Sequence, residues 1–76
     1  MPHAIVKMMA GRTDQQKQKL AEAVTNAIVA TAGVGGESVS VAIEDVAQDD
    51  WTEKVYKPDI LNGFGKLYKR PGYNPL

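Results

Sequence analysis

The order of three local patterns is the feature that most restricts how this 76-residue chain can fold. The segment His3–Met9 is mostly apolar and has the composition of a strand. Thr13–Gln16 matches a capping box, the hydrogen-bonded pattern that begins a helix. Val39–Glu44 alternates apolar and polar residues, as a strand with two different faces does. Strand, helix and strand in this order almost always form a right-handed β-α-β unit with parallel strands, so we expect an α+β fold.

The helix predicted after Thr13 carries apolar residues spaced three or four apart, which places them on one face. This stripe consists of Leu20, Val24, Ala27, Ile28 and Thr31. The helix is expected to end at a group of glycines, Gly33, Gly35 and Gly36.

The C-terminal third has a weaker pattern. Asp49–Trp51 is expected to be a loop or short turn. A short C-terminal helix is predicted beyond it, although two glycines weaken it, and the turn at Pro71-Gly72 is expected to end it. The apolar residues with helical spacing are Ile60, Leu61, Phe64, Leu67 and Tyr68.

Composition restricts the classes of partner. Nine basic residues balance nine acidic ones, which argues against nucleic acid or an anionic membrane as the main partner. Cysteine is absent and His3 is the single histidine, so we expect no metal site and no cofactor. The chain is short enough for one domain, residues 1–76, and we expect it to be cytoplasmic. Two strands make a marginal sheet with open edges, which predicts a homo-oligomer.

Pro2 directly follows the initiator methionine. Removal of Met1 would give Pro2 a free secondary amine at the start of the first strand. An α-amino group titrates near ~7.7–8.0, and an apolar pocket or a nearby cation lowers that pKa. Such an amine can act as a general base. If Met1 stays attached, the Pro2 nitrogen is an amide and has no basic role.

Four features together resemble the 4-oxalocrotonate tautomerase family, small enzymes that use an amino-terminal proline. Pro2 opens the first strand, and Gly11–Lys17 is similar to the family's segment at the helix start. Ser38–Glu44 has the place and length of the second strand, and Trp51 lies where the family carries an aromatic residue. The tail Lys69–Tyr73 is similar to that of the branch named tautomerase PptA. This branch favours a dimer, with a hexamer possible.

The resemblance implies a role for each of four residues. Pro2 would be the general base, and Arg12 would bind the substrate carboxylate and, if near, lower the pKa of the amine. Trp51 would form an apolar wall, or else serve as a buried anchor or subunit contact. Ser40 replaces an arginine of well-studied members, so it offers a hydroxyl to the distal end of the substrate in place of a charge. Each of these residues also has an interpretation without a catalytic role, as a turn, strand-surface or subunit-contact residue. The same holds for His3, and the tail lysines are expected to be solvated.

The expected activity is therefore ketonisation of small 2-hydroxy-alkenoates or enolpyruvates, of the 2-hydroxymuconate or phenylenolpyruvate kind. Ser40 favours acids with one carboxylate. Two alternatives remain at this point. One is decarboxylation or dehalogenation of unsaturated acids on the same scaffold, with Glu44 or Asp45 as an extra carboxylate. The other is a non-enzymatic oligomerising module.

Overall fold

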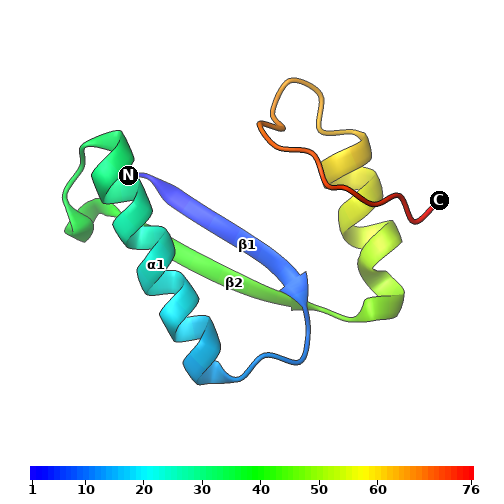
Figure 1. Cartoon of the computed structure of the whole chain (residues 1–76), viewed down its shortest axis with the longest axis horizontal. Helices are drawn as coiled ribbons and strands as arrows, with labels where there is room; N and C mark the ends of the chain where they lie inside the picture. Colours follow the sequence, from blue (N-terminus) through cyan, green and yellow to red (C-terminus); the bar gives the residue numbers. More distant parts are fainter.

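The computed structural model describes all 76 residues and contains the predicted β-α-β unit (Figure 1). Strand β1 spans His3–Met9, helix α1 spans Asp14–Ala32, and strand β2 spans Ser40–Val46. The strands are parallel, in a register that runs from His3 opposite Ser40 to Met9 opposite Val46. A short 3₁₀ turn, η1 (Gly36–Ser38), connects α1 to β2.

The bounds of β1 agree with the prediction, whereas β2 is displaced toward the C-terminus. Val39 is not part of the strand, because its N–H donates to the carbonyl of Gly36 and closes η1 at 3.2 Å. At the other end, the N–H of Ala10 donates to the carbonyl of Val46 at 3.0 Å. This bond continues the pairing beyond Glu44, where the predicted strand ended.

Helix α1 begins and ends as its sequence indicates. The Gln16 N–H donates to Thr13 Oγ1 at 3.1 Å, and the Thr13 N–H donates to Gln16 Oε1 at 2.9 Å, so both halves of the capping box are present. The helix ends at Gly33, which has a φ of 70° and donates to the carbonyl of Val29. A side chain would strain this left-handed conformation, which explains the glycine.

Helix α1 lies along β2 on one face of the sheet (Figure 1). The predicted stripe is correct at Leu20, Val24 and Ile28, which are half-buried, and wrong at Ala27 and Thr31, which are exposed. Four other positions of α1 are half-buried: Lys17, Ala21, Thr25 and Val29. At its first turns the helix is tied to β2 by an ion pair between Lys17 Nζ and Asp45 Oδ2 at 2.9 Å.

The C-terminal segment differs most from the prediction. The loop or short turn expected at Asp49–Trp51 is a 3₁₀ turn, η2 (Gln48–Asp50), which agrees with the prediction and leads into the helix η3 (Thr52–Leu61). A short C-terminal helix is therefore present, but its predicted position around Ile60–Tyr68 is wrong, because helical structure ends at Leu61. In a single chain, Phe64 is 82% exposed and Tyr68 fully exposed, so no packing supports a helix there.

The sequence of η3 explains its wide turns and its end. Pro58 has no N–H, and its ring would collide with a carbonyl of an ordinary α-helix. The turn widens into a π-helix, in which the N–H of Asn62 donates to the carbonyl of Lys57, five residues earlier. Gly63 follows, and a Cβ there would collide with the carbonyl oxygen of Asp59. The chain can therefore turn sharply after η3 only because that residue is glycine.

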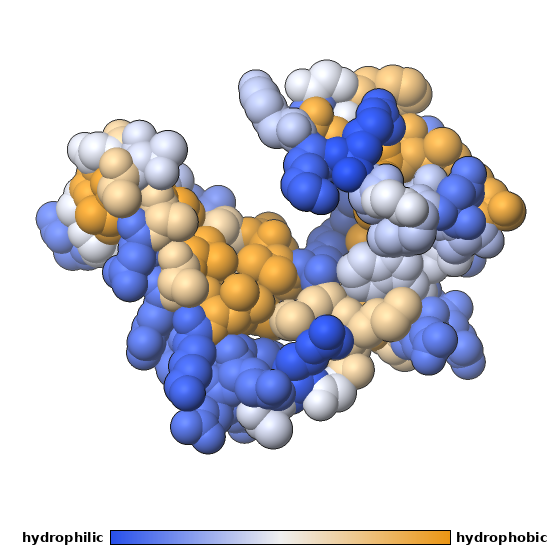
Figure 2. Space-filling view, in the orientation of Figure 1, coloured by the Kyte–Doolittle hydropathy of each residue, from blue (hydrophilic) through white to orange (hydrophobic).

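A single chain buries little of itself. Only Val55 and Tyr56 of η3 are fully buried. The chain exposes 5740 Å², compared with about 4,500 Å² for a compact monomer of 8.2 kDa. Its radius of gyration is 13.8 Å, compared with about 11 Å for a compact domain of this length. Figure 2 shows hydrophobic residues over the strands, in the hollow between α1 and the C-terminal segment. No helix is long and apolar enough to cross a bilayer.

Replacement of the α1 cap tests this account of the helix start. Thr13→Ala removes the side chain that accepts from Gln16, and we expect the free energy of unfolding to fall by about 1 kcal/mol. Urea unfolding at one fixed protein concentration measures it. Thr31→Ala is the matched control, because that exposed threonine makes no side-chain hydrogen bond. Equal stability of the two variants would show that the cap is dispensable.

Candidate active site

A pocket of about 540 Å³ lies at the carboxyl end of β1 and contains two of the four predicted site residues. The end of β1, the loop before α1, the start of η3 and the C-terminal tail form its walls. Arg12 supplies a cation, and Trp51 supplies an aromatic surface. The remaining lining residues are Lys7, Met8, Met9, Gln48, Thr52, Tyr73 and Pro75.

Arg12 is the cation of this pocket that has no anionic partner. Its guanidinium donates from Nη1 to the carbonyl of Met9 at 3.2 Å and forms no ion pair. A guanidinium has five N–H donors, so most of them stay free to bind an anion. Their fork geometry suits a carboxylate, which can accept two parallel hydrogen bonds.

Lys7 also lines the pocket, but its charge is already neutralised. Its Nζ lies 2.5 Å from Asp59 Oδ2 of η3. The hydrogen bond that Lys7 Nζ donates to Asp59 is the main cause that raises the pKa of Lys7 above 10.5; desolvation lowers this pKa, and attraction to Asp59 and Glu44 raises it further. The sequence analysis missed this pair. A lysine within the apolar run of β1 was the available signal, because such a charge needs a partner.

Trp51 is held by the C-terminal tail. Its Nε1–H donates to Tyr73 Oη at 2.8 Å. The Tyr73 ring in turn packs on Tyr56, with centroids 5.8 Å apart and planes tilted by 45°. The sequence analysis used Tyr73 only as part of a tail motif. No local pattern relates two residues 22 positions apart, so only the folded chain reveals this contact.

Pro2 and Ser40 lie at the opposite end of the strand pair. The carbonyl of Pro2 accepts from the Ser40 N–H at 3.1 Å. Ser40 Oγ and His3 Nδ1 share a hydrogen bond of 2.6 Å. Met1 is present, and its terminal amine donates to the carbonyl of Ser38 at 2.6 Å, so the Pro2 nitrogen is an amide in this form of the chain.

A single chain therefore does not bring Pro2 and Arg12 together. Strand β1 runs from His3 to Met9 between them, and six residue steps in a strand span about 20 Å. Arg12 reaches back only to Met9, at the far end of that strand. The structure divides the predicted residues into two groups, Arg12 with Trp51 and Pro2 with Ser40.

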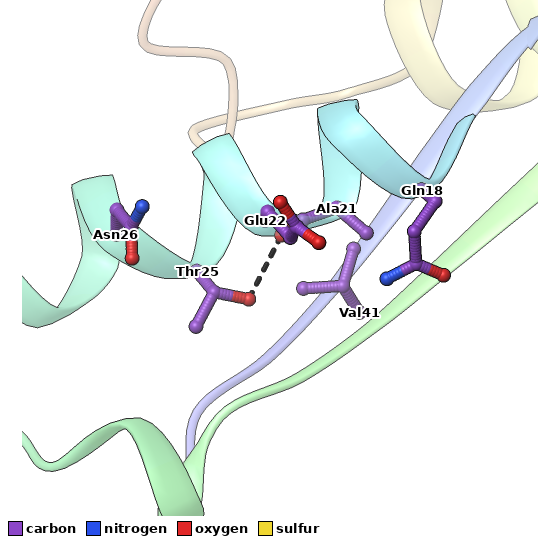
Figure 3. Close-up of a pocket in the computed structure, with 6 residues that line it drawn as sticks. All are labelled: Gln18, Ala21, Glu22, Thr25, Asn26 and Val41. Carbon is purple, nitrogen blue, oxygen red and sulfur yellow. Dashed lines mark hydrogen bonds between the residues drawn. The ribbon is translucent and has the colours of Figure 1, made fainter. Parts of the chain in front are cut away.

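A second groove lies between α1 and the edge of β2 and contains none of the predicted site residues (Figure 3). Its lining residues are Gln18, Ala21, Glu22, Thr25, Asn26 and Val41. The Thr25 hydroxyl is already used, because it donates to the carbonyl of Ala21 at 2.8 Å. The groove has no cation, and no group of three acidic or histidine side chains anywhere in the chain could hold a metal ion. The pocket at Arg12 is therefore the better candidate.

Comparison with known proteins identifies the family of this chain. Residues 2–54 match the family model described as "Tautomerase enzyme". The solved structure of TomN, a 4-oxalocrotonate tautomerase homologue of the tomaymycin biosynthetic pathway, is 34% identical with a TM-score of 0.64. The match covers 66% of this chain and 77% of TomN. The chain belongs to the 4-oxalocrotonate tautomerase family.

Relatives within this tautomerase family differ in how much of this chain they match. A "Probable tautomerase" of Xylella fastidiosa is 45% identical over 76 residues, 100% of this chain and 93% of the relative. A "Tautomerase PptA" of Enterobacter sp. is 35% identical over 97% of this chain and 99% of its own length. A "2-hydroxymuconate tautomerase" of Bacillus subtilis is 45% identical over 67% of this chain and 82% of its own length. The segment after residue 54 is therefore matched in some relatives and lies outside the family model.

The raised pKa of Lys7 makes part of the stability depend on pH. Folding strengthens proton binding by Lys7, so the ion pair contributes fully below pH 10.5 and is lost as pH rises through the higher folded pKa. The urea midpoint of wild type should therefore fall more steeply than that of Asp59→Asn between about pH 10 and 12. Asp49→Asn, at an exposed aspartate without an ion pair, should keep the wild-type slope. Parallel curves for wild type and Asp59→Asn would contradict the assignment.

Proposed function

We propose that this chain, as one domain of residues 1–76, is a cofactor-independent enol–keto tautomerase that acts on small 2-hydroxy-alkenoate or enolpyruvate acids. One observation carries the proposal: a tautomerase-family chain holds an unpaired guanidinium beside an indole in a pocket of suitable size. The guanidinium suits a carboxylate, and the indole suits a planar unsaturated chain.

Pro2 is the proposed base, once Met1 has been removed. Its secondary amine takes the proton from the enol hydroxyl at C2 of the substrate, and the protonated amine returns a proton to a carbon of the same molecule. The electron pair of the O–H bond becomes part of the new carbonyl, and the carbon–carbon double bond supplies the pair that binds the proton. No atom is gained or lost, so no cofactor is required. Arg12 stabilises the oxyanion that forms at C2 during this exchange.

The site is proposed to join two chains. Strand β1, about 20 Å long, separates Pro2 from Arg12 in one chain, whereas proton transfer needs direct contact. A second copy that brings its Arg12 to this Pro2 completes the site. The exposed surface in excess of a compact monomer is about 1,200 Å². Two chains that each buried this area would form an interface of about 2,400 Å², which is in the range of obligate homodimers. We favour a dimer, with a hexamer as the alternative.

The surroundings of Ser40 favour substrates with one carboxylate. Its hydroxyl is neutral and already bonded to His3. Lys7, the other cation along β1, is engaged by Asp59. A second carboxylate would thus meet no free cation from these residues, whereas an apolar substituent could contact Trp51. Asp45, one of the two carboxylates considered for decarboxylation or dehalogenation, is paired with Lys17 on the α1 side and so is not free to act as the extra carboxylate.

Mixing of two inactive variants tests the shared site. Pro2→Ala and Arg12→Gln should each lower kcat/KM by about 10²- to 10⁴-fold. If Pro2 of one chain works with Arg12 of another, mixed dimers keep one intact site, and an equal mixture regains about a quarter of wild-type turnover. Native mass spectrometry verifies mixing and the loss of Met1. Full turnover by Pro2→Ala, or by a chain that keeps Met1, would remove Pro2 from the mechanism; mixed dimers without turnover would refute the two-chain site.

Substrate preference gives a second test. We expect a phenylenolpyruvate-type monoacid to be ketonised with a higher kcat/KM than the diacid 2-hydroxymuconate. Ser40→Arg should raise the diacid-to-monoacid ratio of kcat/KM by about tenfold, because a charge-assisted hydrogen bond becomes available. Ser40→Ala is the control for loss of the His3 bond and should leave the ratio unchanged. A wild type that prefers the diacid would contradict this role of Ser40.

A further inference from the structure

The C-terminal tail returns to the pocket although it lies outside the residues that match the family model. After η3 the chain turns at Gly63 and again at Gly65, which has a φ of 70°. It then runs back so that Tyr73 and Pro75 form part of the pocket wall. This wall is built from residues that the catalytic proposal does not use.

Tyr73 connects the pocket to the one buried cluster of the chain. Its ring contacts that of Tyr56, which is 7% exposed and lies beside Val55, 5% exposed, in η3. Its hydroxyl accepts the hydrogen bond from Trp51 Nε1. Trp51 is the N-cap of η3, so its backbone is fixed by the helix, and its side chain is half-buried. The bond to Tyr73 is the one hydrogen bond of the indole, and it fixes the direction in which the ring faces.

We propose that Tyr73 is a positioning residue of the active site. It holds the Trp51 indole as a fixed wall near Arg12 and thereby selects enol acids that carry an aromatic substituent. The inference rests on the proposed tautomerase function for its substrate class, and on the Trp51–Tyr73–Tyr56 contacts for its geometry. An acid that carries a flat apolar group and is bound by Arg12 gains stacking contact with an indole that is already oriented. Part of this stacking contact is lost when the Trp51 indole can turn away.

The experiment uses Tyr73→Phe, which removes the hydroxyl and keeps the ring that contacts Tyr56. Trp51 is the single tryptophan, so intrinsic fluorescence reports on this residue alone. We expect acrylamide to quench Trp51 at least about twice as efficiently in the variant as in wild type, because an unbonded indole is more mobile. KM for a phenylenolpyruvate-type acid should rise about fivefold. KM for a small aliphatic enol acid, and kcat for both, should change by less than about twofold.

Two controls separate positioning from a general loss of structure. Tyr68→Phe makes the same change at a fully exposed tyrosine, and its fluorescence and kinetics should match those of wild type. In a Trp51→Phe background, Tyr73→Phe should cause no further rise in the KM for the aromatic acid, because its effect acts through the indole. A further rise there, or unchanged Trp51 quenching in the single variant, would overturn the proposal. An equal rise of KM for aromatic and aliphatic acids would overturn the selection for aromatic substituents.

A binding measurement distinguishes failure of this inference from failure of the proposed function. Cinnamate, an aromatic carboxylate that cannot tautomerise, is titrated against Trp51 emission without any turnover. We expect it to bind wild type and to bind Tyr73→Phe about fivefold more weakly. If no enol acid is turned over, the proposed activity fails, while weaker binding by the variant still supports the positioning role. Equal affinity of the two proteins, or no binding to wild type, would overturn the role of Tyr73.

Discussion

The parallel pairing of β1 with β2 is the constraint on which the arrangement of this chain depends. Parallel strands need a long connection, and α1 provides it on one face of the sheet. The same pairing puts the start of both strands at one end, with Pro2 and Ser40, and the end of both strands at the other, with Arg12 and Trp51. The separation of the proposed base from the proposed anion-binding group is thus a direct consequence of strand direction. It makes a second chain the simplest means to bring the two groups together.

The distribution of buried and exposed residues also favours association with a second chain. A β-α-β unit covers one face of two strands, and the C-terminal segment forms its own small buried cluster at Val55 and Tyr56. The strands between them keep hydrophobic residues at the surface (Figure 2). Ile5 of β1, for example, is 54% exposed. Apolar residues that are costly to leave in water therefore lie on these strands, and the proposed base and anion-binding group lie at the two ends of β1. In the proposed oligomer, one association would satisfy both requirements.

The sequence predicted features that depend on short-range interactions more accurately than features that depend on contacts between distant residues. The start of α1 was predictable because Thr13 and Gln16 bond within four residues, and its end because Gly33 adopts a conformation that glycine favours. The prediction was wrong around Ile60–Tyr68, where apolar spacing was helical but Pro58 and Gly63 set the local backbone. Among the predicted site residues, Arg12 and Trp51 line one pocket, whereas Pro2 and Ser40 lie at the other end of the strand pair. Lys7–Asp59 and Trp51–Tyr73 were not predicted, because these contacts join residues 52 and 22 positions apart.

The sequence by itself determined the strand–helix–strand order, the parallel direction of the strands and the family to which the chain belongs. The element order depends on hydrophobic periodicity, capping and glycine conformations, which act between near neighbours. The strand direction follows from that order, and the family from the order and spacing of four sequence features along the chain. Only the tertiary structure decided that Arg12 is left without an anionic partner while Lys7 is neutralised, and that the tail holds Trp51 through Tyr73. Such pairings depend on which distant segments approach within hydrogen-bonding distance, and that is fixed by the path of the whole chain.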